Sequence, residues 1–140
     1  MRFPMVLLAA ALLAGCASQS TSTSGPKAGP LPTGEVTYWQ VLRTQFEDHM
    51  KADSYAKIPP DLRHNISGCM ADYVVDNVTP AQLRHLDAVA AGTETPDPDL
   101  TSKLDAQVTA SIDKLDRGDL AVLTPYCPTY VASFQKYASP

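Results

Sequence analysis

The stretch from residue 35 to residue 57, EVTYWQVLRTQFEDHMKADSYAK, decides the fold class of this chain. Its large apolar side chains recur at intervals of three, four and four residues, at Trp39, Leu42, Phe46 and Met50. Residues with this spacing lie on one face of an α-helix, so the stretch predicts an amphipathic helix with Trp39 buried at its start. The following Pro59-Pro60 pair ends this helix, because proline cannot continue one.

The next two segments carry helix signals of their own. Pro60 suits the first position of a second helix, and its inward face is predicted to hold Leu62, Ile66, Cys69, Met70 and Tyr73. Thr79-Pro80-Ala81-Gln82 has the form of a capping box and starts a third helix. Gly92 suits the left-handed residue that follows such a helix. We predict a close helix–helix approach at Gly68, because glycine inside a helix costs about 1 kcal/mol relative to alanine.

The last third of the chain also reads as helical. Residues 93–99 contain two prolines and predict a loop. A fourth helix is expected from Leu100 to about Gly118, with an inward stripe of Leu104, Val108, Leu115 and either Ser111 or Ile112. A short turn and a final helix are expected after Leu120, with Tyr126, Tyr130, Phe134 and Tyr137 assigned to the core. No run alternates with period two, so the sequence predicts an all-α bundle of four to five helices over residues 35–140.

The first sixteen residues, MRFPMVLLAAALLAGC, combine a positive start, an apolar stretch and small residues before Cys16. This is the pattern of a secretory signal peptide, and it is too short for a membrane helix. Leu13-Ala14-Gly15-Cys16 resembles the lipobox of bacterial lipoprotein precursors. The resemblance implies removal of residues 1–15 and lipidation of Cys16 by diacylglycerol and an N-acyl chain such as palmitate. An ordinary cleaved leader, with Cys16 as an incidental thiol, is the alternative.

Residues 16–34 are expected to form the lipidated cysteine and a flexible tether, because residues 17–34 are dominated by Ser, Thr, Gly and Pro. Two or three acyl chains hold a protein stably at a membrane, whereas one chain does so only marginally. Ala17 and Ser18 follow Cys16, and the absence of Asp there favours the outer membrane, facing the periplasm, in the lipoproteins that the leader resembles. We therefore expect a protein anchored by lipid to the bacterial cell envelope.

Lipidation of Cys16 leaves two cysteines in the chain, Cys69 and Cys127. An even number of cysteines in an exported domain predicts a disulfide. Such a bond stabilises the fold by roughly 4 kcal/mol in the chain-entropy account. The alternative is a redox-active or partner-linked thiol, which is typically found in a Cys-x-x-Cys motif or beside a cationic residue, and neither occurs locally.

Charge and motifs exclude several classes of function. From Glu35 onward the chain has nine basic and fifteen acidic residues, a formal charge of −6, and the basic residues are scattered. This distribution argues against binding nucleic acid or anionic lipid surfaces. The sequence contains no Gly-x-Ser-x-Gly motif and no glycine-rich phosphate loop, so we expect no catalytic residues, no cofactor and no enzymatic activity.

The remaining polar residues are interpreted as exposed or helix-capping side chains and not as parts of a functional site. His49, His64 and His85 lack the spacing of a metal site on one helix, so we expect exposed histidines and no metal. The acidic residues of the fourth helical region are expected at helix starts and on solvated faces: Asp97, Asp99, Asp105, Asp113, Asp116 and Asp119.

Three functional hypotheses follow. The leading one is a membrane-anchored periplasmic module that binds an envelope protein of unknown identity. The second is an acid-stress or holdase chaperone of the periplasm, because small helical proteins of that kind share the size and the pair of cysteines. The third is an accessory subunit, or an enzyme whose site is assembled from scattered residues.

Overall fold

The computed structural model describes residues 36–138, so the predicted leader, Cys16 and the tether lie outside the described residues. The elements in chain order are α1 (Tyr38–His49), a 3-10 turn η1 (Asp53–Tyr55), α2 (Pro60–Asp76), α3 (Pro80–Ala90), α4 (Pro98–Asp116), a 3-10 turn η2 (Ala121–Leu123) and α5 (Pro128–Ala138). Within residues 36–138 there are five α-helices and no strand, which confirms the predicted all-α fold.

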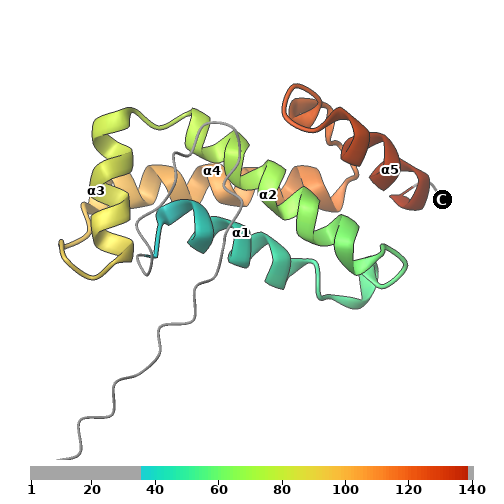
Figure 1. Cartoon of the computed structure of the whole chain (residues 1–140), viewed down its shortest axis with the longest axis horizontal. Helices are drawn as coiled ribbons and strands as arrows, with labels where there is room; N and C mark the ends of the chain where they lie inside the picture. The colour runs from blue at the N-terminus through green and yellow to red at the C-terminus, as the bar shows by residue number, and fades with distance from the viewer. Residues whose placement is uncertain (1–35, 139–140) are drawn as a thin grey trace, which may run out of the picture.

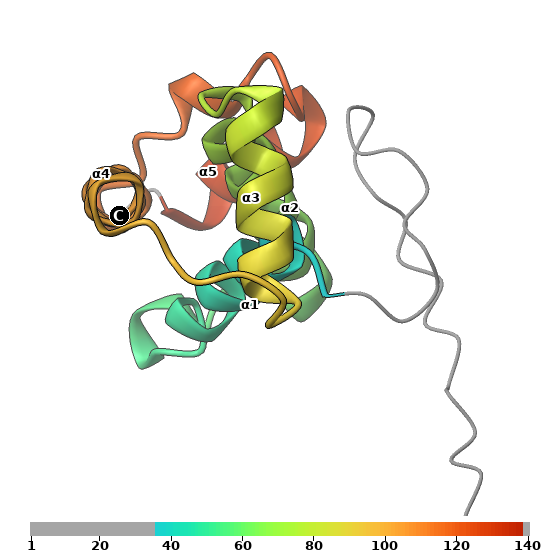
Figure 2. The same ribbon diagram turned by 90° about the vertical axis from the view of Figure 1, so that its left-hand side faces the viewer.

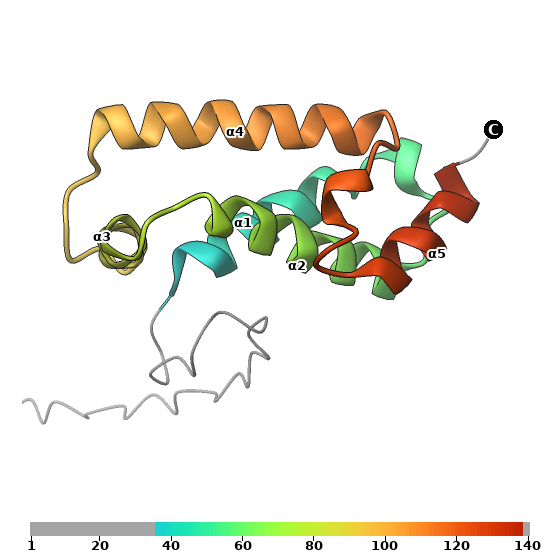
Figure 3. The same ribbon diagram turned by 90° about the horizontal axis from the view of Figure 1, so that it is seen from above.

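The helices form two layers with a helix at each end. The helices α1 and α2 run side by side in opposite directions (Figure 1), and α4 lies over one side of this pair (Figure 3). At one end α3 lies across α1 and α2, and the loop that follows it leads to α4, which Figure 2 views end-on; α5 packs at the other end. The described chain starts at the α3 end and finishes at the α5 end.

The first helix is shorter than its apolar spacing predicted. It starts at Tyr38 because Thr37 forms a capping box with Gln40, and it ends at His49 instead of continuing to residue 57. The chain turns after Met50 so that Tyr55 and Ile58 fold back into the core, where each is only 5% exposed. Burying these two side chains is incompatible with a straight helix through this segment.

Trp39 is buried, as predicted, and lies against the glycine in α2. The indole is 7% exposed, and its Nε1 donates a hydrogen bond of 2.8 Å to Oδ1 of Asp72. A Cβ placed on Gly68 comes 3.7 Å from Cζ2 of Trp39. The close approach at Gly68 is therefore made by an aromatic side chain of α1, and it leaves just enough room for a methyl group.

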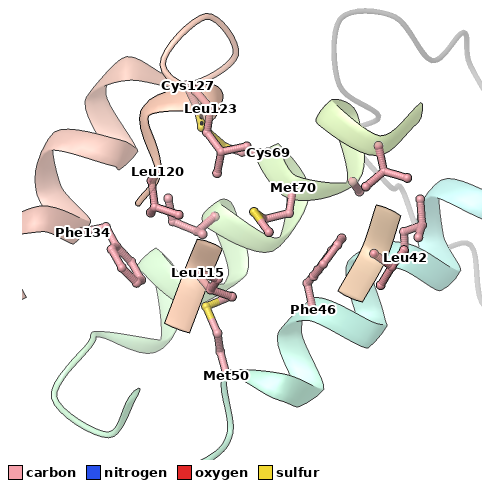
Figure 4. Packing of buried hydrophobic residues seen from close by; sticks show 14 of the residues in the cluster. Leu42, Phe46, Met50, Cys69, Met70, Leu115, Leu120, Leu123, Cys127 and Phe134 are labelled. Atoms are coloured by element: carbon pink, nitrogen blue, oxygen red, sulfur yellow. Dashed lines mark hydrogen bonds between the residues drawn. A yellow bond between two sulfur atoms is a disulfide. The ribbon is translucent and has the colours of Figure 1, made fainter. Parts of the chain in front are cut away.

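The central helix of the bundle is α2, which buries residues on several sides. Cys69 of α2 and Cys127 lie at disulfide distance with their Cα atoms 6.3 Å apart, which confirms the predicted pair. Around them the core is continuous between the layers (Figure 4), and its largest fully buried side chains include Phe46, Phe134, Leu42, Met50 and Met70. The disulfide thus joins α2 to the segment that leads into α5.

Local capping signals set the ends of α3 and α4. The predicted capping box of Thr79 and Gln82 is present. Gly92 and Gly118 have positive φ angles of 77° and 68° and end their helices with paired backbone hydrogen bonds, as left-handed glycine caps do. The start of α4 was predicted two residues too late, because Asp97 caps the helix and Pro98 occupies its first position.

The inward face of α5 differs from the predicted aromatic stripe. Phe134 is buried, but Tyr130 and Tyr137 are 41% and 45% exposed, so their assignment to the core was wrong. The core-facing residues are Cys127, Val131 and Phe134, spaced four and three apart. Because the disulfide fixes Cys127 against α2, this set turns inward and the two tyrosines are rotated to the flank of the helix.

Candidate functional site: a cleft at the α5 end

A cleft of about 680 Å³ opens at the α5 end of the bundle, where the last residues of α1, α4 and α5 meet the segment from Ala52 to Ile58. Its floor reaches the core, because Leu115 and Phe134, which line it, are each only 1% exposed. Figure 4 shows both side chains beside Met50 in the core. On the wall of the cleft, Tyr137 keeps almost half of its side chain in solvent.

A hydrogen-bonded group of three side chains forms one wall of the cleft. Nε2 of His49, the last residue of α1, lies 2.8 Å from Oδ1 of Asp116, the last residue of α4. The Tyr55 hydroxyl of η1 donates to the same carboxylate oxygen, and the Tyr55 and His49 rings meet edge to face at 5.7 Å. We call this group the His49–Tyr55–Asp116 latch, because it ties three separate elements together.

The hydrogen bonds of the latch shift the pKa values of Asp116 and Tyr55. The hydrogen bond from His49, and then that from Tyr55, hold the pKa of the Asp116 carboxyl below its ordinary value. Burial, followed by the hydrogen bond to Asp116, raises the pKa of Tyr55, so this phenol stays protonated at neutral pH. Asp116 was assigned to a solvated face, and its side chain is indeed 48% exposed, but it is also the hub of the latch.

The composition of the cleft bears on the enzyme hypothesis. Ser54 lines the same cleft as the His49–Asp116 pair, which brings a hydroxyl, an imidazole and a carboxylate into one site. Nucleophilic catalysis needs the hydroxyl within hydrogen-bond reach of the base. Among the described residues no hydrogen bond joins Ser54 to His49.

The other two histidines also lie beside carboxylates. Nδ1 of His64 in α2 is 3.3 Å from Glu47 of α1, and Nδ1 of His85 in α3 contacts Glu94 in the loop that follows. His64 is exposed, as expected, whereas His49 and His85 are about one-third exposed. Within residues 36–138 no cluster of three or more His, Cys, Asp or Glu side chains is arranged to hold a metal ion.

A second tyrosine–carboxylate pair lies beside the disulfide. The Tyr126 hydroxyl donates to Asp76 at 2.6 Å, and this hydrogen bond is the main reason that the pKa of Tyr126 rises to about 12. The Tyr126 ring also meets Tyr73 edge to face, with the ring centres 6.2 Å apart. Tyr126 therefore docks the η2–α5 segment onto α2, while Tyr130 and Tyr137 project from the flank of α5.

Comparison of the chain with protein-family models, with curated proteins and with solved structures gives no match. None of the helices within residues 36–138 is both long enough and apolar enough to cross a membrane. The function of this chain is therefore inferred from its sequence motifs and from the cleft.

The latch was missed in the sequence because its members are far apart in the chain. His49 and Asp116 are 67 residues apart, and Tyr55 and Asp116 are 61 apart. The one local signal was the position of Asp116 near the predicted end of the fourth helix, because the first helix was predicted to continue well past His49. Helix ends gather at the ends of a bundle, but the sequence alone does not say which ends meet.

Proposed function

We propose that this protein is a lipoprotein of the bacterial cell envelope whose helical domain binds a protein partner through the cleft and the adjoining flank of α5. The lipid anchor is inferred from Leu13-Ala14-Gly15-Cys16, and the tether is inferred from the Ser/Thr/Gly/Pro-rich residues that follow. With these signals the mature domain is held at the membrane, facing the periplasm, where it meets other envelope proteins.

One observation carries the assignment of the binding surface. Tyr130 and Tyr137 are exposed on α5, seven residues apart, and Tyr137 also lines the cleft. Tyrosine is enriched at the energetic centres of protein interfaces, because its ring supplies a large contact area and its hydroxyl a hydrogen bond. An exposed tyrosine pair next to a cleft that reaches the core fits the composition of a protein-binding surface.

Site-specific photocrosslinking in cells tests this surface. A photoreactive amino acid replaces Tyr130 or Tyr137 in the full-length chain, and Thr109, exposed on α4, serves as the control position. We expect a discrete crosslinked species from both tyrosine positions and none from position 109. Equal products from all three positions, or none from either tyrosine, would contradict the proposal.

The anchor is tested separately by labelling cells with radioactive palmitate. The wild-type chain should incorporate the label and lose residues 1–15, and Cys16→Ser should abolish both. A mature protein without lipid, or one that starts at another residue, would contradict the lipoprotein assignment.

The latch favours an acid-stress chaperone as a second candidate. Protonation of Asp116 removes its charge from the wall of a cleft whose floor is Leu115 and Phe134. Because the latch lowers the pKa of Asp116, a chaperone that works in this way suppresses aggregation of a denatured client only at a pH below the ordinary pKa of Asp, and not at neutral pH. Light scattering by an acid-denatured client protein, with and without the purified chain, distinguishes this activity from partner binding.

A further inference from the structure

The segment from Ala52 to Ile58 is attached to α4 by the latch. Within the described residues the backbone hydrogen bonds of this segment run between residues 49 and 58, so they connect it to itself and to the end of α1. Its hydrogen bond to α4 comes from the Tyr55 hydroxyl, which donates to Asp116. Regions of a protein that have few backbone ties to their neighbours open locally at a lower free energy than the whole domain. The latch is therefore placed to decide whether the segment stays closed.

A single carboxylate oxygen carries both hydrogen bonds of the latch. Oδ1 of Asp116 accepts from His49 and from Tyr55, so one proton on this carboxyl group affects both bonds. A hydrogen bond to an ionised acceptor is roughly twice as strong as a hydrogen bond between neutral groups. The bonds from His49 and then from Tyr55 lower the pKa of Asp116, so the carboxylate keeps its charge in mild acid and loses it in stronger acid. Both bonds weaken at that point.

Charged groups from several elements face the latch. The lining of the cleft holds two carboxylates and two cations: Asp53, Asp116, Lys57 and Arg117. Arg117 also lies 3.9 Å from the Asp113 carboxylate, and Arg63 of α2 donates to the backbone oxygen of Met50. From α5 comes Tyr137, whose phenol carries no charge in neutral or acidic solution. With His49 counted as neutral, the positive and negative charges of the lining are equal in number at neutral pH.

Acid removes this balance. When the solution is acidic enough to protonate Asp116, carboxyl groups of ordinary pKa are already neutral and histidine is charged. His49, Lys57 and Arg117 then face one another as cations, and no carboxylate of the lining keeps its charge. Like charges repel, so this change acts in the same direction as the weakening of the two hydrogen bonds. Both favour separation of the segment from α4.

We propose that the latch is a pH-sensitive closure of the cleft, which opens when Asp116 gains a proton. Tyr55 is then released from α4, and the segment from Ala52 to Ile58 uncovers the floor formed by Leu115 and Phe134. This inference rests on the proposed function in taking the cleft as the site of the partner, and it adds that acid controls access to that site. The opening itself is a property of the chain without its partner.

Hydroxyl-radical footprinting of the full-length chain, purified in detergent, tests the opening. Mass spectrometry measures how fast each side chain is modified at neutral pH, at about pH 5 and below the ordinary pKa of Asp. Tyr55 and Phe134 are buried in the closed form, and their modification should rise about tenfold in the most acidic sample, the change expected when a charge-assisted hydrogen bond loses its charge. It should not rise between neutral pH and about pH 5, where an ordinary Asp is still charged.

The wild-type chain contains its own control for global unfolding. Met70 is 1% exposed and lies in the middle of the core, and Trp39 is buried at the α3 end. Both side chains react readily with hydroxyl radicals when they are exposed. They should remain protected in the sample in which Phe134 becomes modified, because the proposed opening is confined to the α5 end. Circular dichroism at each pH shows whether the helices remain.

Four variants identify the group that triggers the opening. Tyr55→Phe keeps the ring but removes the hydroxyl, and Asp116→Asn removes the charge, so both should raise the modification of Phe134 already at neutral pH and reduce its response to acid. His49→Gln keeps an N–H donor without a titrating ring and should retain the acid response, because Asp116 still loses its charge. Asp76→Asn removes the carboxylate that pairs with Tyr126 and should leave both values as in the wild type.

Three results would overturn the inference. The first is equal modification of Phe134 in mild and in strong acid, and the second is a parallel rise at Met70, which means that the whole domain unfolds. The third is an acid response in Asp116→Asn as large as that of the wild type. Because footprinting needs no partner, any of these results together with crosslinks at Tyr130 and Tyr137 leaves the proposed function standing. An acid opening without crosslinks at either tyrosine keeps the closure and removes the partner.

Discussion

The two ends of this bundle are held by different kinds of interaction. At the α3 end, short-range caps set the helix boundaries, and Tyr38 and Trp39 donate hydrogen bonds to Asp87 and Asp72, which lie 49 and 33 residues away. At the α5 end, a disulfide and the latch join residues 58 to 67 positions apart. The α3 end thus depends on packing and caps, whereas the α5 end depends on bonds that respond to redox state and pH.

This contrast matters because the cleft lies at the α5 end. There the latch ties the ends of α1 and α4 to η1 beside the cleft, above a floor that belongs to the core. The α3 end, where the described chain starts, is held instead by the hydrogen bonds from Tyr38 and Trp39 to Asp87 and Asp72 and by the burial of Trp39. Four substitutions separate the two contributions.

The largest effect is expected at the α3 end from Trp39→Ala. Loss of the buried indole leaves a cavity beside Gly68 and removes the hydrogen bond from Trp39 to Asp72, which should cost about 3–5 kcal/mol of unfolding free energy. Urea unfolding followed by circular dichroism measures the loss, and Trp39→Phe should lose less because most of the packing remains. In the wild type, the single tryptophan should emit at short wavelength when folded, and solvent-like emission would contradict its burial.

The next effect is expected at the α5 end from the cysteine pair. Replacing Cys69 and Cys127 together by Ala should lower the unfolding free energy by roughly 4 kcal/mol in the chain-entropy account. Either single substitution should cost about as much as both, because each breaks the same bond. The Trp39→Ala loss should persist in reducing agent, whereas the loss from the cysteine substitutions should vanish there. Two free thiols at positions 69 and 127 in protein from the oxidising envelope would contradict the predicted bond.

A smaller effect is expected from Thr79→Ala, which removes the cap of α3. The Thr79 side chain accepts a hydrogen bond from the Gln82 backbone, and loss of such a cap costs about 1 kcal/mol. Thr79→Ser keeps the hydroxyl and should recover most of the stability. A change in the exposure of the cleft in Thr79→Ala, measured by hydrogen exchange of residues 52–58, would show that the two ends are coupled.

The smallest effect is expected from Asp116→Asn, and it depends on pH. The folded state lowers the pKa of Asp116, so the carboxylate contributes stability above its ordinary pKa, and this contribution is lost as pH falls through the lower folded value. At neutral pH the substitution should therefore cost under about 1 kcal/mol, since the side chain is half exposed, and the difference should disappear at acid pH once Asp116 is protonated. Asp105→Asn, on the exposed face of α4, is the control. A difference between Asp116→Asn and the wild type that grows toward acid would contradict this account.

The sequence by itself determined the helical elements and the disulfide partners. Helix period, proline and glycine act through neighbouring backbone, so the Thr79 capping box, the Gly92 cap and the burial of Trp39 were readable from residues nearby. Two cysteines left by the predicted lipidation of the third allow only one intramolecular pairing. The errors in α1 and α4 are errors of helix length, because the apolar pattern reveals neither the turn after Met50, which ends α1 early, nor Asp97, which caps α4.

Only the tertiary structure decided which face of α5 turns inward and what forms the cleft. The spacing of Tyr130, Phe134 and Tyr137 fits an inward stripe as well as that of Val131 and Phe134 does, and the choice between them was made when Cys127 was fixed against α2. The latch and the cleft form because the ends of α1, α4 and α5 and the segment from Ala52 to Ile58 converge at one end of the bundle. Such convergence depends on how whole helices pack, and helix packing is set by the summed burial of many side chains rather than by any local pattern.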